Sequence, residues 1–192
     1  MIKRVCVYCA SSSKVDSIYK KEAFLLGSIL SKEGIACNYG GGSVGLMGEL
    51  ADAMCKNSGE ITGIIPKFMV EKGWGNPNVK QIEVDTMHER KQRMIKDVDA
   101  AIALPGGCGT LEELMEIITW KQLSIFNKPI IILNVNHYFD PLIEMLEKAI
   151  SENFMREEHK TMWVCVSSAE EVIKNIKNAP HWDDEEIHFA TI

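Results

Sequence analysis

The sequence predicts a single α/β domain built on a doubly wound, mostly parallel sheet. Its 192 residues are the usual length of one such domain. Short apolar segments alternate with longer segments of helical periodicity, which is typical of strands linked by crossover helices. The strand segments are almost continuously apolar, as expected when helices cover both faces of the sheet.

The expected elements follow one another without a linker or an internal repeat. Strands are expected at 4–10, 35–39, 60–66, 79–84, 100–105, 129–135 and 162–166, and helices at 16–32, 45–58, 86–98, 110–124, 140–151 and 168–177. The segment 66–80 contains proline and glycine and is expected to be a mobile loop near the site. Residues 1–180 form the expected domain, and 181–192 form an acidic, loosely packed tail.

The composition narrows the class of protein. A net charge of -6 argues against a broad nucleic-acid or membrane surface. No apolar run reaches the roughly 18–20 residues that span a bilayer. The first apolar segment is too short for a signal peptide and is better explained as a strand. We therefore expect a cytoplasmic protein without a nucleic-acid or membrane partner.

The cysteines are expected to be buried, reduced thiols. Several of the six lie inside apolar runs, and Cys6 and Cys9 would point to opposite faces of one strand. No second CxxC and no HxxxH completes a zinc site, so no metal is expected.

Small and polar residues follow three of the expected strands. They are the segments "ASSS", with Ser11 and Ser12, "GGGSVG" and "PGGCGT". Ligands of open α/β sheets bind outside the carboxyl ends of the strands. Three flexible turns at one edge therefore predict a phosphate or nucleotide site.

The first glycine loop, "YGGGSVGLMGE", leads from the second strand into the helix 45–58. Its glycines allow close approach of backbone amides to an anion at a helix N-terminus, with Gly41 and Gly42 as expected contacts. Gly40, Gly42 and Gly45 formally match GxGxxG, but the dinucleotide signal is weak because the loop follows the second strand. No GK[ST] occurs, so the loop is not a P-loop. Tight packing of the turn is the alternative explanation.

The helix 86–98 carries an arginine among its apolar residues. Met87, Met94 and Val98 mark the apolar stripe, and Arg90 falls on it. A buried guanidinium needs an anionic partner, which would be a phosphate, Glu113 or another acid. A purely structural ion pair remains open. The neighbouring His88 is expected to be a surface or capping residue.

The second glycine loop, "LPGGCGTLEE", begins the helix 110–124. Gly106, Gly107 and Gly109 can direct amides at a phosphate, and Thr110 can cap the helix or donate to the same anion. Acidic residues favour a helix N-terminus on electrostatic grounds alone. Next to a phosphate, however, Glu112 and Glu113 need other partners, such as ribose hydroxyls or an attacking water.

The periodicity of 110–124 predicts which side of the helix meets the core. Leu111, Leu114, Met115 and Ile118 share one face, whereas Glu113, Glu116 and Trp120 lie opposite. A large aromatic side chain that points away from the core favours another surface, so we expect a second subunit near Trp120. A singly exposed tryptophan under a loop is the alternative.

Four motifs together resemble the LOG (Lonely Guy) family, the cytokinin riboside 5'-monophosphate phosphoribohydrolases, formerly described as possible lysine decarboxylases. The motif PGGxGTxxE spans Pro105–Glu113, M-H-x-R-K spans Met87–Lys91, and GGGxxGLMG spans Gly40–Gly48. The pattern ITWxQLxIxxKPIxxLN spans Ile118–Asn134. The resemblance covers roughly residues 3–155 in collinear order.

The resemblance implies a Rossmann-like fold and a homodimer with its sites near the subunit interface. It implies hydrolysis of the N-glycosidic bond of adenosine 5'-monophosphate-type nucleotides, N6-modified ones included, which releases the free base and ribose 5-phosphate without metal or organic cofactor. Arg90 and Glu113 occupy the catalytic positions. The expected substrate-binding residues are Ser11, Ser12, Gly41, Gly42, Met87, Lys91, Gly106, Gly107, Gly109, Thr110 and Glu112.

The sequence departs from the family pattern in two places, and three other functions are compatible with parts of it. Many relatives carry glycine where this chain has Ala10, and the segment 66–80, which should shape the base pocket, is individual to this chain. The main alternative is a nucleotide sensor or carrier without hydrolase activity. A dinucleotide-dependent oxidoreductase is less consistent with the loop position. Lysine decarboxylation is the least expected, because it normally uses pyridoxal phosphate on a Schiff-base lysine.

Overall fold

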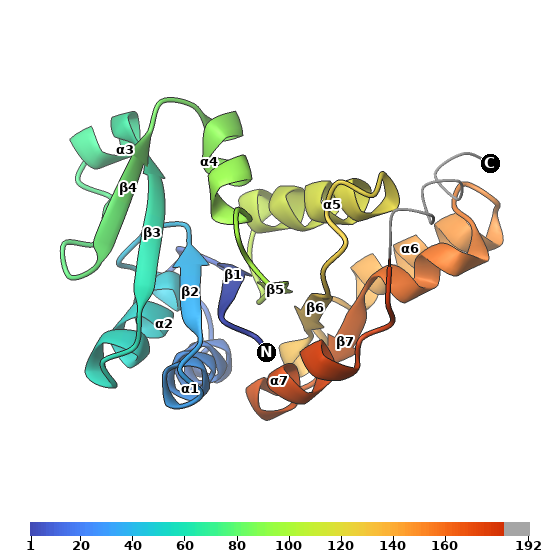
Figure 1. Ribbon diagram of the computed structural model, residues 1–192, viewed down its shortest axis with the longest axis horizontal. Helices are drawn as coiled ribbons and strands as arrows, with labels where there is room; N and C mark the ends of the chain where they lie inside the picture. The colour runs from blue at the N-terminus through green and yellow to red at the C-terminus, as the bar shows by residue number, and fades with distance from the viewer. Residues whose placement is uncertain (183–192) are drawn as a thin grey trace.

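The computed structural model describes residues 1–182, and these form one seven-stranded parallel sheet flanked by helices (Figure 1). The order across the sheet is β4-β3-β2-β1-β5-β6-β7, and every neighbouring pair is parallel. The strands are β1 (Arg4–Tyr8), β2 (Ala36–Tyr39), β3 (Ile61–Pro66), β4 (Lys80–Val84), β5 (Ala100–Ala103), β6 (Ile130–Leu133) and β7 (Val164–Val166). The predicted fold class is confirmed.

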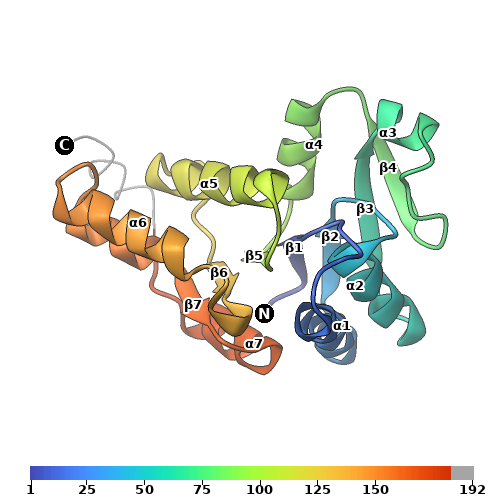
Figure 2. The same ribbon diagram turned by 180° about the vertical axis from the view of Figure 1, so that it is seen from behind.

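The helices divide into two layers, because successive side chains of each strand point to opposite faces. Val5 and Val7 of β1 belong to one buried cluster, and Cys6 and Tyr8 belong to the other. The first cluster lies under α1 (Ser17–Lys32), α2 (Gly45–Lys56) and α7 (Ala169–Asn178). The second lies under α4 (Met87–Met94), α5 (Cys108–Gln122) and α6 (Asp140–Ser151), on the opposite side of the sheet (Figures 1 and 2).

The direction of winding reverses between β1 and β5. From β1 the chain builds β2, β3 and β4 to one side, and it then returns to place β5, β6 and β7 on the other side. The loops that follow β1 and β5 therefore diverge, which opens a crevice at their carboxyl ends. The amide of Ala10 donates to the carbonyl of Pro105 at 3.2 Å and holds the two loops together at the base of that crevice.

One glycine brings α2 against the crevice. Gly45 begins α2 with a φ of 65°, which side-chain-bearing residues rarely adopt. A Cβ at this position would lie 2.5 Å from the carbonyl oxygen of Ser12. Glycine is therefore needed both for the backbone conformation and for the contact between α2 and the loop after β1.

The remaining elements show where sequence patterns were insufficient. The predicted loop 66–80 begins with a short helix, α3 (Lys67–Glu71), and α4 ends at Met94 instead of residue 98. Two 3-10 turns, η1 (Val135–His137) and η2 (Glu157–Met162), complete the order. In the predicted tail, Trp182 is buried in the second cluster, and 183–192 lie outside the described residues.

The prediction that the cysteines are buried holds for three of the six. All six are free thiols, as expected, and Cys6, Cys9 and Cys37 are buried. Cys55, Cys108 and Cys165 are exposed, so that part of the prediction was wrong. Cys55 and Cys108 lie on helices, where the apolar runs of the sequence alternate between the core and solvent. Among the helices described, none is long and apolar enough to cross a membrane.

Candidate active site

A cavity of about 640 Å³ opens at the carboxyl ends of the central strands. It is lined by the loops after β1, β2 and β5, by α4 and α5, and by the segment after β3. Its lining residues are Cys9, Ala10, Ser11, Ser12, Gly40, Gly42, Ser43, Val44, Met47, Ile65, Met69, Gly73, Trp74, Arg90, Gly107, Gly109, Thr110 and Glu113. The cavity thus joins all three turns that the sequence singled out.

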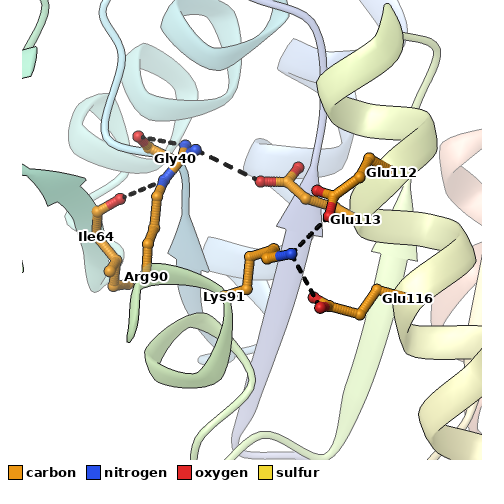
Figure 3. Close-up of polar contacts among 7 residues, drawn as sticks. All are labelled: Gly40, Ile64, Arg90, Lys91, Glu112, Glu113 and Glu116. Carbon is orange, nitrogen blue, oxygen red and sulfur yellow. Dashed lines mark hydrogen bonds and ion pairs between the residues drawn. The ribbon is translucent and has the colours of Figure 1, made fainter. Parts of the chain in front are cut away.

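Arg90 is held in the cavity wall by two hydrogen bonds and an ion pair. Its Nε donates to the carbonyl of Ile64 and its Nη2 to the carbonyl of Gly40, each at 3.1 Å. Its Nη1 lies 3.6 Å from Oε1 of Glu113, and the two side chains point toward one another (Figure 3). Arg90 is only 7% exposed. The predicted burial of this cation is confirmed, and of the partners left open by the sequence the structure places Glu113 beside it.

Glu113 is a buried carboxylate, contrary to the helical-wheel prediction that placed it opposite the core. It is 6% exposed and lines the cavity from the first turns of α5. Burial raises its pKa to about 7, although Arg90 opposes the rise by favouring the charged form. A carboxyl group with such a pKa can change protonation near neutral pH, which is typical of functional sites.

The N-terminus of α5 offers free backbone donors to the cavity. Gly107 is the N-cap of α5, and no side chain caps this helix. Gly107, Gly109 and Thr110 line the cavity beside the first turn. A Cβ on Gly106 would collide with the side chain of the buried Thr110, so glycine is required there. Unpaired amides and the helix dipole together make this end of the cavity suitable for a phosphate.

The structure brings together most, but not all, of the predicted site residues. Those that line the cavity are Ser11, Ser12, Gly42, Arg90, Gly107, Gly109, Thr110 and Glu113, whereas Gly41, Met87, Lys91, Gly106 and Glu112 do not. For these five, direct contact with a substrate stays a prediction.

The structure gives these five residues other surroundings. Lys91 binds Glu112 at 2.5 Å and Glu116 at 2.9 Å, and so links α4 to α5 (Figure 3). Met87 is 38% exposed at the start of α4. The carbonyl of Gly41 accepts the amide of Asn76.

The cavity has an apolar wall whose individual residues the sequence did not identify. It consists of Val44, Met47, Ile65, Met69 and Trp74. Apolar residues next to a loop resemble core residues, so nothing in their pattern marked them as cavity-lining. The available signal was the segment 66–80, which was expected to shape the pocket and contributes Met69, Gly73 and Trp74.

The loop that carries Trp74 is attached to the first glycine loop. Gly75 pairs with Gly42 in an antiparallel bridge, and the Asn76 amide donates to Gly41 at 2.8 Å. These bonds hold Trp74 at the cavity edge, although its side chain is 55% exposed.

The outward side of α5 also differs from the prediction. Met115, expected in the core, is 37% exposed, and Lys121 is buried. Trp120 is partly buried and packs against the second cluster instead of pointing away from it. Burial lowers the pKa of Lys121 to about 8, and its ammonium donates to the carbonyl of Lys128 at 2.9 Å.

The described residues limit the kinds of chemistry at the site. They contain no cluster of three or more metal-ligating side chains, and no lysine of this part of the chain lines the cavity. Lys121, the buried lysine with a lowered pKa, lies elsewhere on α5. The arrangement therefore provides an anion site, a buried arginine–carboxylate pair and an apolar wall, but not the Schiff-base lysine that pyridoxal-dependent decarboxylation uses.

The chain is similar in sequence to proteins of known activity. The chain is 40% identical over 194 residues to the cytokinin riboside 5'-monophosphate phosphoribohydrolase LOG of Oryza sativa subsp. japonica, covering 97% of this chain and 80% of that protein. It is 41% identical over 177 residues to LOG1 of Arabidopsis thaliana, covering 92% and 83%.

Among solved structures, the molybdenum cofactor binding protein of Rippkaea orientalis matches with a TM-score of 0.69 over 93% of this chain and 97% of that chain. The two are 24% identical, so the likeness concerns the fold. The family model described as "Possible lysine decarboxylase" matches residues 47–176. With this match and relatives near 40% identity over almost its whole length, the chain belongs to the LOG family.

Proposed function

We propose that the protein hydrolyses the N-glycosidic bond of adenosine 5'-monophosphate-type nucleotides, including N6-modified ones, and releases the free base and ribose 5-phosphate. The observation that carries the proposal is the buried Arg90–Glu113 pair, which lines a cavity next to the uncapped N-terminus of α5. The names of the relatives from rice and Arabidopsis describe this reaction and support it.

The lining of the cavity suggests one orientation for the substrate. The 5'-phosphate binds the amides at Gly107 and Gly109 and the hydroxyl of Thr110, because the uncapped N-terminus of α5 offers free donors there. The base lies toward the apolar wall, where Ile65, Met69 and Trp74 can contact the ring and an N6 substituent. The ribose then lies between them, beside Glu113.

Glu113 acts on the sugar during cleavage. As the bond from C1' to the base nitrogen breaks, its electrons go to the base and positive charge develops on the ribose ring. The carboxylate of Glu113 stabilises that charge and orients the water that adds to C1'. The water that adds to C1' loses one proton and the departing base gains one, so that the reaction consumes only water. Arg90 keeps the carboxylate oriented and favours its charged form.

A second copy of the chain completes the proposed assembly. Met115, Leu123 and Ile125 expose 37%, 43% and 65% of their surfaces on and after α5, close in sequence to the partly buried Trp120. Such apolar exposure is typical of subunit interfaces. We expect a homodimer, which light scattering would show as twice the 21.5 kDa of one chain. The six free thiols fit a reducing compartment such as the cytoplasm.

Release of the base by purified protein tests the proposed reaction. Adenosine 5'-monophosphate and its N6-isopentenyl derivative should each yield free base and ribose 5-phosphate in equal amounts, measured by chromatography. Adenosine, which lacks the phosphate, should react far more slowly. Tight nucleotide binding without any base release would favour the sensor or carrier function instead.

The pH dependence of this reaction should follow Glu113. Since its pKa is about 7 and the ionised form is active, kcat/KM should rise with pH through about 7 and level off above it. The substrate phosphate also ionises, near pH 6 in comparable monoesters. Glu112 raises the pKa of Glu113, so Glu112→Gln should move only the Glu113 transition to lower pH. A profile that Glu112→Gln leaves unshifted would contradict this assignment.

A further inference from the structure

Tyr138 makes a hydrogen bond to the backbone of the second glycine loop. Its phenolic oxygen donates to the carbonyl of Gly106 at 2.6 Å. Tyr138 follows η1, the turn after β6, and β6 is the neighbour of β5 in the sheet. A side chain from a separate loop therefore reaches the carbonyl of Gly106, although it does not line the cavity itself.

The position of that carbonyl determines where an amide points. The carbonyl of Gly106 and the N–H of Gly107 belong to one trans peptide unit, in which they point in opposite directions. Gly107 lines the cavity, whereas Gly106 does not. The Gly107 N–H donates to no protein acceptor among the described residues. Fixing the carbonyl on Tyr138 thus leaves a free donor on the cavity side.

The turn that carries Tyr138 is itself firmly held. Asn136 and His137 have φ values of 50° and 59°, and two consecutive non-glycine residues rarely adopt this conformation unless their surroundings impose it. Asn134 accepts the amide of Phe139 and donates to Asp140, each at 2.7 Å. The Tyr138 ring also packs edge-on against Tyr19, with centroids 6.0 Å apart.

We propose that Tyr138 is a positioning residue for substrate phosphate: its hydrogen bond to the Gly106 carbonyl orients the Gly107 amide toward the phosphate. This inference rests on the proposed function for the identity of the ligand. Its physical basis is that a preoriented amide binds an anion without first having to be ordered. Tyr138 does not act on the glycosidic bond.

Tyr138→Phe isolates the hydroxyl, because the ring and its packing remain. Affinity for ribose 5-phosphate, measured by titration calorimetry, should fall about five- to tenfold, the effect of weakening one charge-assisted hydrogen bond. Affinity for adenosine, which lacks the phosphate, should change less than twofold. In turnover, KM for adenosine 5'-monophosphate should rise while kcat stays within twofold.

Tyr19→Phe is the matched control, since it removes a neighbouring hydroxyl that makes no hydrogen bond in the described chain. It should leave all three measurements unchanged. Unaltered affinity of Tyr138→Phe for ribose 5-phosphate, or an equal loss for adenosine, would overturn the proposed positioning role.

Wild-type protein assayed for base release separates the two proposals. If the wild type releases base but Tyr138→Phe binds ribose 5-phosphate as tightly as the wild type, only the role of Tyr138 is rejected. If Tyr138→Phe binds ribose 5-phosphate more weakly but the wild type releases no base, only the proposed hydrolase activity is rejected.

Discussion

Glu113→Gln should lower kcat for adenosine 5'-monophosphate by about a thousandfold or more, the scale of removing a charge that stabilises a transition state inside a low-dielectric site. Glutamine keeps the size of the side chain and a carbonyl oxygen that can face Arg90. It cannot carry the negative charge that the ribose needs as its bond to the base breaks. The measurement is single-turnover release of adenine by wild-type and variant protein at pH 8, where Glu113 of the wild type is mostly ionised.

The same substitution should leave binding and folding intact. Glu113 is buried with a raised pKa, so its ionised form is unfavourable in the folded protein, and the neutral amide should not lower the melting temperature at pH 8. Affinity for the nucleotide should be retained, because the phosphate donors on α5 are unchanged.

Glu116→Gln is the control for removal of a nearby carboxylate. Glu116 pairs with Lys91 outside the cavity, and Lys91 retains Glu112 as a partner. Its kcat should stay within about twofold of wild type. If Glu113→Gln kept a tenth or more of wild-type kcat, the carboxylate would not be the group that stabilises the ribose.

The sheet was predictable because its strands are uniformly buried. Segments such as residues 100–105 and 129–135 are too apolar for any surface element, and their alternation with helical patterns admits few topologies. The short helix α3 was missed because five residues give too little periodicity to detect, and isolated helices of this length are not stable by propensity alone. It follows β3 directly and buries none of its residues.

The pairing at the centre of the site was also predictable, and for a physical reason. Arg90 falls among apolar residues, and a buried guanidinium requires an anionic partner, which left a phosphate, Glu113 or another acid as candidates. The wheel of α5 misassigned Glu113, because it sorts residues by polarity and assumes that polar faces meet water. Glu113 instead faces a cavity and an arginine, so a functional carboxylate was assigned to the surface.

The contacts of Lys91, Glu112 and Tyr138 could not be obtained from sequence patterns. Lys91 belongs to the M-H-x-R-K motif, yet it links α4 and α5 through Glu112 and Glu116 instead of lining the cavity. Tyr138 reaches Gly106 from 32 positions away. Such partners depend on the relative placement of neighbouring strands and helices, which a local pattern does not specify.

Replacing Arg90 should damage both activity and stability, in contrast to Glu113→Gln. Arg90→Ala leaves the carbonyls of Ile64 and Gly40 without their donor and Glu113 without its cation. Breaking a buried pair in this way costs about 3–5 kcal/mol of folding free energy. The pKa of Glu113 should rise further, because Arg90 opposes the effect of burial. At pH 7 less of the carboxylate would be ionised, so kcat/KM should fall by about a thousandfold.

Arg90→Lys separates the charge of this residue from its geometry. Lysine keeps a cation near Glu113, but its single ammonium cannot bind two carbonyls and a carboxylate in the planar arrangement of a guanidinium. Its stability should therefore lie between those of wild type and Arg90→Ala, with kcat/KM still lowered about a hundredfold if orientation is what the reaction requires. Arg93→Ala, an exposed position on the same helix, should change neither denaturant midpoint nor turnover. Wild-type kcat/KM in Arg90→Lys would show that charge alone suffices, and would restrict Arg90 to supporting the ionised form of Glu113.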